Sequence, residues 1–213
     1  VLACSTVTWV LPSFINSIGF VKNVIKPPQR TLSQSSENTA LAPPVLNIPY
    51  EATNTAQIDI KGFGTPNSKI KLFIDDDPKQ TINVSNDGSF DFEKVLLNLG
   101  TNNIYGKTID ERGGESLPSK EVKLIYINEK PSLNINEPED GKKIQGGDKK
   151  VKVSGKTDPG VQVFVSGNQV IVDRDGNFGI DLNLDEGDNT ISIKAVDAAS
   201  NSIEIQRRVN YTP

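Results

Sequence analysis

One phrase occurs twice in this chain of 213 residues. Residues 87–110 read DGSFDFEKVLLNLGTNNIYGKTID, and residues 175–197 read DGNFGIDLNLDEGDNTISIKAVD. Both copies run from Asp-Gly-x-Phe, through a glycine and an asparagine, to an apolar residue followed by aspartate. A repeat at this spacing indicates two copies of one module, each close to the ~100 residues of a small sandwich domain. A solenoid would instead repeat every ~20–50 residues.

Apolar and polar side chains alternate through much of residues 44–213. Ile58 and Ile60 alternate with polar neighbours, as do Val161, Val163 and Val165 in the second copy. Alternation with a period of two indicates strands that have one face in a core and the other in water. Turn signals such as Asn-Asp-Gly and Asp-Pro-Gly separate about seven such strands per copy, the number in an immunoglobulin-type sandwich. The sequence therefore predicts a mainly β fold with two tandem Ig-like antiparallel β-sandwiches.

The repeated phrase is interpreted as turn and core chemistry. An Asp-Gly pair supplies the positive backbone dihedrals of a tight hairpin turn, and the phenylalanine that follows is expected to point inward. The later glycine allows a left-handed turn, and the asparagine can bond nearby backbone. The residues of this structural motif are Asp87, Gly88, Phe90, Gly100, Asn102 and Asp110 in the first copy, and Asp175, Gly176, Phe178, Gly187, Asn189 and Asp197 in the second. We expect the second copy to be the more regular and more stable module.

The end of the phrase resembles bacterial Ig-like domains, including the glucodextranase-like domain B group. The second copy keeps Ala195, Asp197 and Asn201 of the pattern typical of these domains, whereas the first has Thr108 and Gly114 at two of the matching places. The resemblance covers residues 44–213. It implies a surface-exposed sandwich that spaces, binds or adheres, and it implies no catalytic residues.

Composition removes several classes of site. The chain has no histidine, which excludes Ser-His-Asp catalysis and every zinc site that needs a histidine. Its one cysteine, Cys4, excludes a disulfide within the chain and a Cys₄ zinc site. Residues 1–43 carry +2 and the whole chain −4, which leaves −6 for residues 44–213. Because nucleic-acid binding relies on a basic face, we predict no nucleic-acid partner, and we also predict no cofactor and no enzymatic activity.

The first 21 residues contain no charged side chain. Such a run can cross a bilayer as a helix of about 20 residues, so residues 1–26 are predicted to form a hydrophobic helix that anchors the protein in a membrane through residues 1–21. The alternatives are a buried or interfacial helix, or the rest of a signal peptide. A further alternative is lipidation of Cys4, because Val1-Leu2-Ala3-Cys4 resembles a bacterial lipobox.

The predicted organisation continues from this helix. Residues 27–43 are rich in proline and serine and are predicted to be a flexible linker. The two sandwiches are assigned to residues 44–128 and 129–213. This order predicts a single-pass protein of the cell envelope whose C-terminal domains lie outside the cytoplasm.

Two groups of residues are candidate ligand sites, one for calcium and one for sugars. Asp75-Asp76-Asp77 and the pair Asp173 and Asp175 offer oxygen ligands for calcium, but hairpin-turn chemistry explains them as well. Sugar binding needs exposed aromatic rings on one face, and the candidates are Phe63, Phe73, Tyr105 and Phe164. The favoured hypothesis is a non-enzymatic stalk that spaces, adheres or binds an extracellular protein or glycan. The alternative is a carbohydrate-binding accessory module of a larger surface protein or glycoside-active enzyme.

Overall fold

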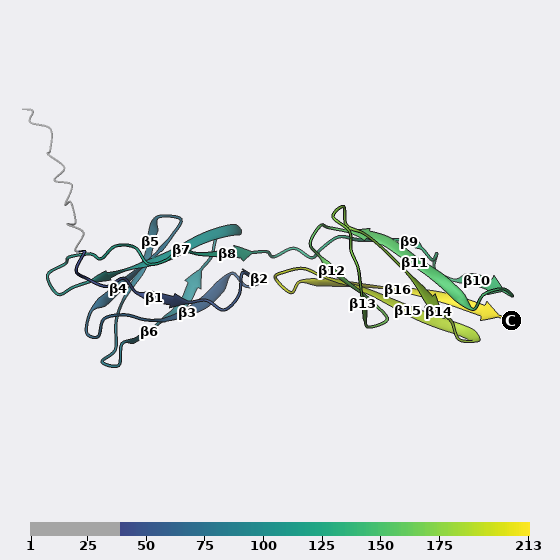
Figure 1. Ribbon diagram of the computed structural model, residues 1–213, viewed down its shortest axis with the longest axis horizontal. Helices are drawn as coiled ribbons and strands as arrows, with labels where there is room; N and C mark the ends of the chain where they lie inside the picture. The colour runs from purple at the N-terminus through teal and green to yellow at the C-terminus, as the bar shows by residue number, and fades with distance from the viewer. Residues whose placement is uncertain (1–38) are drawn as a thin grey trace, which may run out of the picture. The chain divides into compact units, whose positions relative to one another are not determined.

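The computed structural model describes residues 39–213, which form two β-sandwich domains (Figure 1). The predicted fold class, mainly β with two tandem Ig-like sandwiches, is confirmed. The predictions for residues 1–26 and for most of the linker lie outside the described residues. Within residues 39–213 the chain has no helix that is both long enough and apolar enough to span a bilayer.

The first domain has a three-stranded sheet and a five-stranded sheet. Its strand orders are β1-β3-β6 and β2-β8-β7-β4-β5. The strands are β1 (Val45–Asn47), β2 (Ala52–Thr53), β3 (Gln57–Phe63), β4 (Lys69–Ile74), β5 (Asp77–Asn83), β6 (Ser89–Leu96), β7 (Gly100–Ile109) and β8 (Val122–Tyr126).

The second domain repeats this topology. Its sheets have the orders β9-β11-β14 and β10-β16-β15-β12-β13, which match the first domain strand for strand. The strands are β9 (Leu133–Glu137), β10 (Lys142–Gln145), β11 (Lys150–Thr157), β12 (Gln162–Val165), β13 (Asn168–Val170), β14 (Asn177–Asn183), β15 (Gly187–Val196) and β16 (Ser202–Thr212).

Each domain therefore has eight strands, one more than the seven or so expected from the sequence. The first segment of each domain starts in the three-stranded sheet and then crosses to the edge of the five-stranded sheet. It contributes β1 and β2 in the first domain, and β9 and β10 in the second. Both β2 and β10 pair in parallel with the last strand of their domain.

Each domain has its own hydrophobic core. Ile60, Leu72 and Phe92 are fully buried in the first, and Val153 and Val163 are fully buried in the second. These residues occupy alternate strand positions, so the period of two in the sequence becomes the inward face of each sheet.

A glycine allows the same close approach in both cores. Gly62 and Gly155 lie beneath the rings of Phe90 and Phe178, and any Cβ there would collide with the ring and with a backbone carbonyl of the neighbouring strand. The sandwich thus uses a bare backbone position to seat each phenylalanine ring.

Candidate functional site

The Asp-Gly pair of the repeated phrase forms a tight turn in both domains. The Gly88 N–H donates to the Ser85 carbonyl at 2.9 Å, and Gly176 donates to Asp173 at 3.1 Å. Both glycines have a positive φ, 85° and 84°. Asp87 accepts the Ser89 N–H at 3.0 Å, which stabilises its turn.

The expected hairpin at this turn was wrong. The strands on either side, β5 and β6, belong to different sheets, so the turn carries the chain across the core. In the second domain the isolated bridge between Val172 and Phe178 joins the two sides, together with hydrogen bonds between Asp173 and Asn177. Turn residues specify a reversal of the chain, whereas the sheet that the next strand joins depends on where Phe90 and Phe178 can be buried. Both of these rings are 5% exposed.

The glycine and asparagine later in the phrase form a corner. Gly100 and Gly187 adopt φ values of 86° and 88°. The Asn102 side chain accepts the Asn98 N–H at 2.7 Å and donates to the Asn98 carbonyl at 2.8 Å. Asn189 makes the same pair of bonds with Asp185, at 2.8 and 2.7 Å. The asparagine thus fixes the loop that enters β7 or β15.

The aspartate that ends the phrase caps another turn. Asp110 accepts the N–H groups of Arg112 and Gly114 at 2.9 and 2.8 Å. Asp197 accepts the N–H of Asn201 at 2.8 Å and also receives its side-chain amide. The motif residues therefore lie in turns, corners and cores, and the fold distributes them around each domain without gathering them into one site.

The acidic run Asp75-Asp76-Asp77 joins β4 to β5. Asp75 and Asp76 have positive φ values, 51° and 66°, as a two-residue hairpin turn requires. Asp75 accepts the Asn103 N–H at 3.0 Å and the Asn103 side-chain amide at 3.1 Å, and this bonding lowers the pKa of Asp75. The carboxylate of Asp75 is therefore engaged within the domain.

The other acidic pair has a similar arrangement. Asp173 accepts the N–H groups of Asp175 and Asn177 at 3.0 and 2.7 Å. The side chain of Asn177 also donates to Asp173, and this bond is the main cause of the lowered pKa of Asp173. Across residues 39–213, no three acidic or cysteine side chains come together as a metal site would require.

The four aromatic candidates do not form one platform. Phe73 and Tyr105 stack on the five-stranded sheet with ring centroids 4.9 Å apart, but Phe73 is only 9% exposed. Burial and a hydrogen bond to Asp76 raise the pKa of Tyr105. Phe164 lies in the second domain on β12. Phe63 stands apart on β3 and is 64% exposed.

Phe63 lies on the outer face of the three-stranded sheet. It pairs across the strands with Val45, which is 65% exposed, so two apolar side chains face solvent together. The next cross-strand row contains Asn47, Lys61 and Asp91. The Lys61 Nζ lies 3.7 Å from the Asp91 carboxylate.

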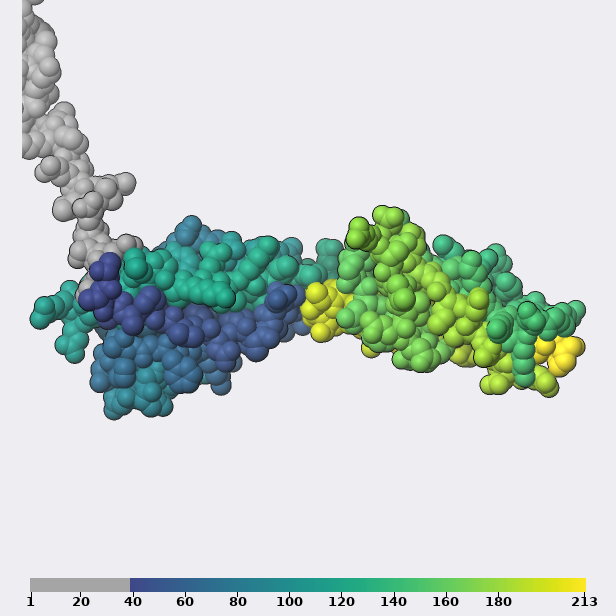
Figure 2. Space-filling view, in the orientation of Figure 1, coloured from purple at the N-terminus to yellow at the C-terminus, as the bar shows by residue number. Residues whose placement is uncertain are grey.

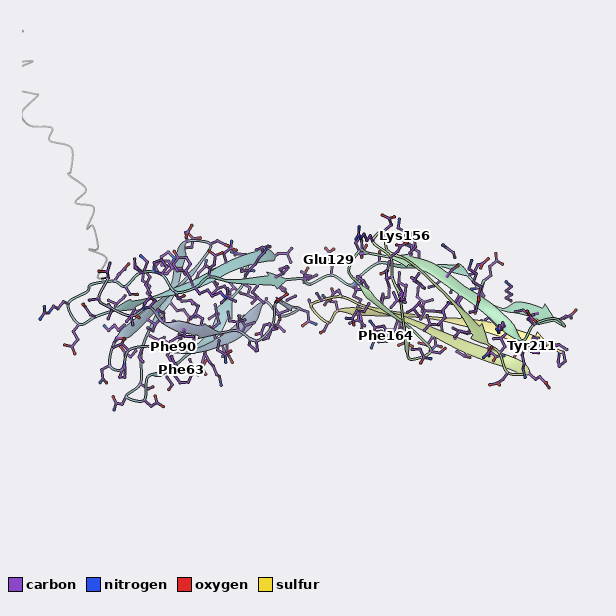
Figure 3. The ribbon with its side chains drawn as sticks, viewed as in Figure 1. Phe63, Phe90, Glu129, Lys156, Phe164 and Tyr211 are labelled. Atoms are coloured by element: carbon purple, nitrogen blue, oxygen red, sulfur yellow. The ribbon has the colours of Figure 1, made fainter. Side chains whose placement is uncertain are left out.

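A shallow groove of about 430 Å³ is lined by Asn47, Lys61, Phe63 and Asp91. Its apolar part is the ring of Phe63, and its polar part includes an amide, an ammonium and a carboxylate. Figure 3 labels Phe63 close to Phe90, which also lines the groove. Such a groove can hold a ligand that has one apolar face and polar edges.

The second domain shows that the fold does not require this apolar pair. The residue after its ring-seating glycine is Lys156 (Figure 3), the counterpart of Phe63. Lys156 pairs with Asn134 on one side and Asn177 on the other, and all three are exposed. The outer face of the first domain therefore carries an exposed apolar pair that the second domain lacks at the same place.

The sequence indicates Phe63 as an exposed aromatic candidate but does not indicate the groove around it. Asn47 and Asp91 join Phe63 and Lys61 only through strand pairing, because these two residues lie 44 positions apart in the chain. The difference between Gly62-Phe63 and Gly155-Lys156 in the two copies was the signal that could have indicated it.

Comparison with known proteins agrees with this architecture. Residues 131–212 match the family model described as glucodextranase, domain B. Bacillopeptidase F of Bacillus subtilis (strain 168) is 27% identical over 149 residues, which cover 70% of this chain and 10% of that protein. The chain thus spans about a tenth of the length of this curated relative.

A solved structure shows the same fold. The fibronectin(III)-like modules of Clostridium thermocellum CbhA align with a TM-score of 0.53 and 16% identity, over 79% of this chain and 94% of that one. At this level of identity the likeness concerns the fold alone. The chain carries two tandem Ig-like domains.

Proposed function

We propose that the two Ig-like domains are non-catalytic modules of a larger protein displayed outside the cytoplasm, where they space or bind. The observation that carries this proposal is the use of the repeated phrase. Its aspartates, glycines and asparagines are bonded within turns and corners, and its phenylalanines fill the cores. The residues that the two copies share are therefore those that support the fold. This suits a structural module that occurs in tandem.

The comparisons support this proposal. Glucodextranase domain B, which matches the second domain, is itself a non-catalytic Ig-like domain. The aligned part of Bacillopeptidase F is a small share of a long protein, as expected for modules placed beside other domains. The membrane anchor predicted in residues 1–26 would hold such modules at the cell surface.

Cell fractionation combined with protease added from outside tests this placement. We expect the protein in the envelope or extracellular fraction, with residues 44–213 open to cleavage in intact cells. Recovery of the full-length protein in the cytosol would reject the placement.

Carbohydrate binding is the second candidate, and the groove beside Phe63 favours it. A pyranose ring has an apolar C–H face that suits an exposed aromatic ring, and hydroxyl edges that suit Lys61, Asp91 and Asn47. The groove offers both within about 430 Å³.

A glycan array tests this candidate with a matched pair of variants. Phe63→Lys installs the residue that the second domain has at this place, and Lys156→Ala alters the second domain only. We expect Phe63→Lys to abolish the glycan signal and Lys156→Ala to leave it unchanged. An array with no signal for the native protein would remove this candidate while leaving the spacer role intact.

A further inference from the structure

A second groove of the first domain runs beside β8, the last strand of the five-stranded sheet. Leu46, Ile48, Tyr50 and Glu51 line one side, and Lys120, Glu121, Lys123 and Ile125 line the other, around about 770 Å³. Figure 2 shows the purple N-terminal segment of this domain lying against its teal later strands. The groove is partly apolar and follows the edge of a sheet.

The backbone of Lys123 faces this groove. Strand β2 pairs with β8 only at Ile125 and Tyr126, and the Ile125 N–H donates to the Glu51 carbonyl at 2.9 Å. Successive residues of a strand direct their backbone groups to opposite sides, so Lys123, two residues before Ile125, faces the same way. Among residues 39–213, no partner on this side is found for its N–H or its carbonyl.

The second domain closes the equivalent edge. Gly100 pairs with Tyr126 in the first domain, and Gly187 pairs with Tyr211 in the second, so Tyr126 and Tyr211 are equivalent. Lys123 and Arg208 each lie three residues before these tyrosines and therefore correspond to each other. Here β10 pairs with β16 along Val209 to Thr212. The Arg208 N–H donates to Asp140 at 2.9 Å, and the Arg208 carbonyl accepts the Gly141 N–H at 2.8 Å.

The sequence explains why the first domain lacks this closure. Thr53 pairs with Tyr126, and Ile144 pairs with Tyr211, so Thr53 and Ile144 are equivalent. Pro49 and Asp140 each lie four residues before them, so Pro49 is the counterpart of Asp140. Proline has no carboxylate that could accept the Lys123 N–H as Asp140 accepts the Arg208 N–H. The Arg208 guanidinium also binds the Asp140 carboxylate at 2.9 Å, whereas no ion pair is found for Lys123 in the described part of the chain.

We propose that this edge of β8 binds an extended peptide segment of a partner protein by strand addition, with one peptide carboxylate in the place that Asp140 takes in the second domain. A carbonyl or this carboxylate accepts the Lys123 N–H, and a peptide N–H donates to the Lys123 carbonyl. An apolar side chain of the peptide packs on Leu46 and Ile48, and the carboxylate faces Lys123. Because Glu51 and Glu121 also line the groove, further acidic side chains would be repelled. Open sheet edges are known templates for such pairing.

Nuclear magnetic resonance of the ¹⁵N-labelled full chain tests this proposal. The probe is a capped octapeptide in which valine and threonine alternate around one central aspartate, and the control peptide carries proline in place of its central valines. We expect the probe to shift the amide signals of Val122, Lys123 and Leu124. Exchange of the Lys123 amide should slow about tenfold when the probe is at ten times its Kd, and the proline peptide should have no effect.

Variants show whether the backbone edge is responsible. Lys123→Pro removes the N–H at a position where an edge strand tolerates proline, and it should abolish binding. Pro49→Asp supplies an internal carboxylate and keeps the strand intact, so it should weaken binding at least about tenfold, or about 1.4 kcal/mol. Asp140→Ala serves as the control in the second domain, where it should speed exchange of the Arg208 amide.

Three outcomes would overturn the proposal. One is the absence of shifts at millimolar probe, and another is equal binding of the proline peptide. The third is protection of the Lys123 amide that rises with protein concentration without any peptide, because it would assign the edge to a second copy of this chain. None of these results bears on the placement of the protein or on its spacer role.

Discussion

The two domains have the same sandwich topology but differ in how far their last two strands pair. In the second domain, β15 pairs with β16 continuously from Gly187 to Val196. In the first, β7 pairs with β8 only from Gly100 to Ile104, and the rest of β7 faces an irregular loop. The same topology is thus held by a long backbone ladder in one domain and by a shorter ladder in the other.

Side chains replace the missing ladder in the first domain. The Thr108 N–H donates to the Ser116 hydroxyl at 2.9 Å, and the Gly106 N–H donates to the Ser119 hydroxyl at 3.0 Å. Pro44 packs over Gly106, where a Cβ would come within 3.0 Å of the proline ring. Buried serines and a packed N-terminal segment can therefore take the place of backbone pairing in an Ig-like sheet.

The largest expected effect concerns the two cores. Phe92 is fully buried on β6, and its cross-domain counterpart Ile180 is only partly buried. Phe92→Ala should lower the free energy of unfolding of the first domain by about 3–5 kcal/mol. Ile180→Ala should cost the second domain less, because fewer contacts are lost. Urea unfolding followed domain by domain through resolved amide signals measures both, and equal losses would contradict this ranking.

The next effect concerns the buried serines. We expect the first domain to unfold at lower urea than the second, because its ladder is shorter. Ser116→Ala should widen this gap by about 1–3 kcal/mol, since it leaves the buried Thr108 N–H without a partner. The control Ser202→Ala, at the start of β16, should change stability by less than about 0.5 kcal/mol. A first domain that outlasts the second in urea would reverse our interpretation of the ladder.

A smaller effect depends on pH. Hydrogen bonds from Arg208 lower the pKa of Asp140 from 3.8 to about 2. A carboxyl whose folded pKa is depressed stabilises the fold above its unfolded pKa, and this contribution is lost as the pH falls from about 3.8 towards 2. Exchange of the Arg208 amide, corrected for intrinsic rates, should therefore speed up in this window. An Asp140→Asn variant should not show this pH dependence, and a variant that retained it would exclude Asp140 as the cause.

The smallest expected effect is on the outer face. Phe63→Lys makes the first domain resemble the second at a position that is 64% exposed, so its stability should change by no more than about 0.5 kcal/mol. Thermal unfolding of this variant checks the prediction. A large loss would show that Phe63 supports the fold, and it would weaken the argument for a ligand at the groove.

Local chemistry in the sequence accounts for much of the architecture. The alternation around Ile58 and Val163 predicts the strands, and the repeated phrase predicts two copies of a sandwich. The corner formed by Gly100 and Asn102 also follows from neighbouring residues, because the glycine dihedral and the asparagine bonds act within a few positions.

The places where distant segments meet become visible in the tertiary structure. It showed that the Asp87-Gly88 turn crosses between sheets, that Phe63 lies beside Val45, and that Lys123 lacks the closure of Arg208. These features depend on which strands pair and in which register, and that choice is made by burial across the whole domain. Local sequence patterns specify two Ig-like modules, whereas the surfaces of these modules depend on cross-strand neighbours that lie far apart in the sequence.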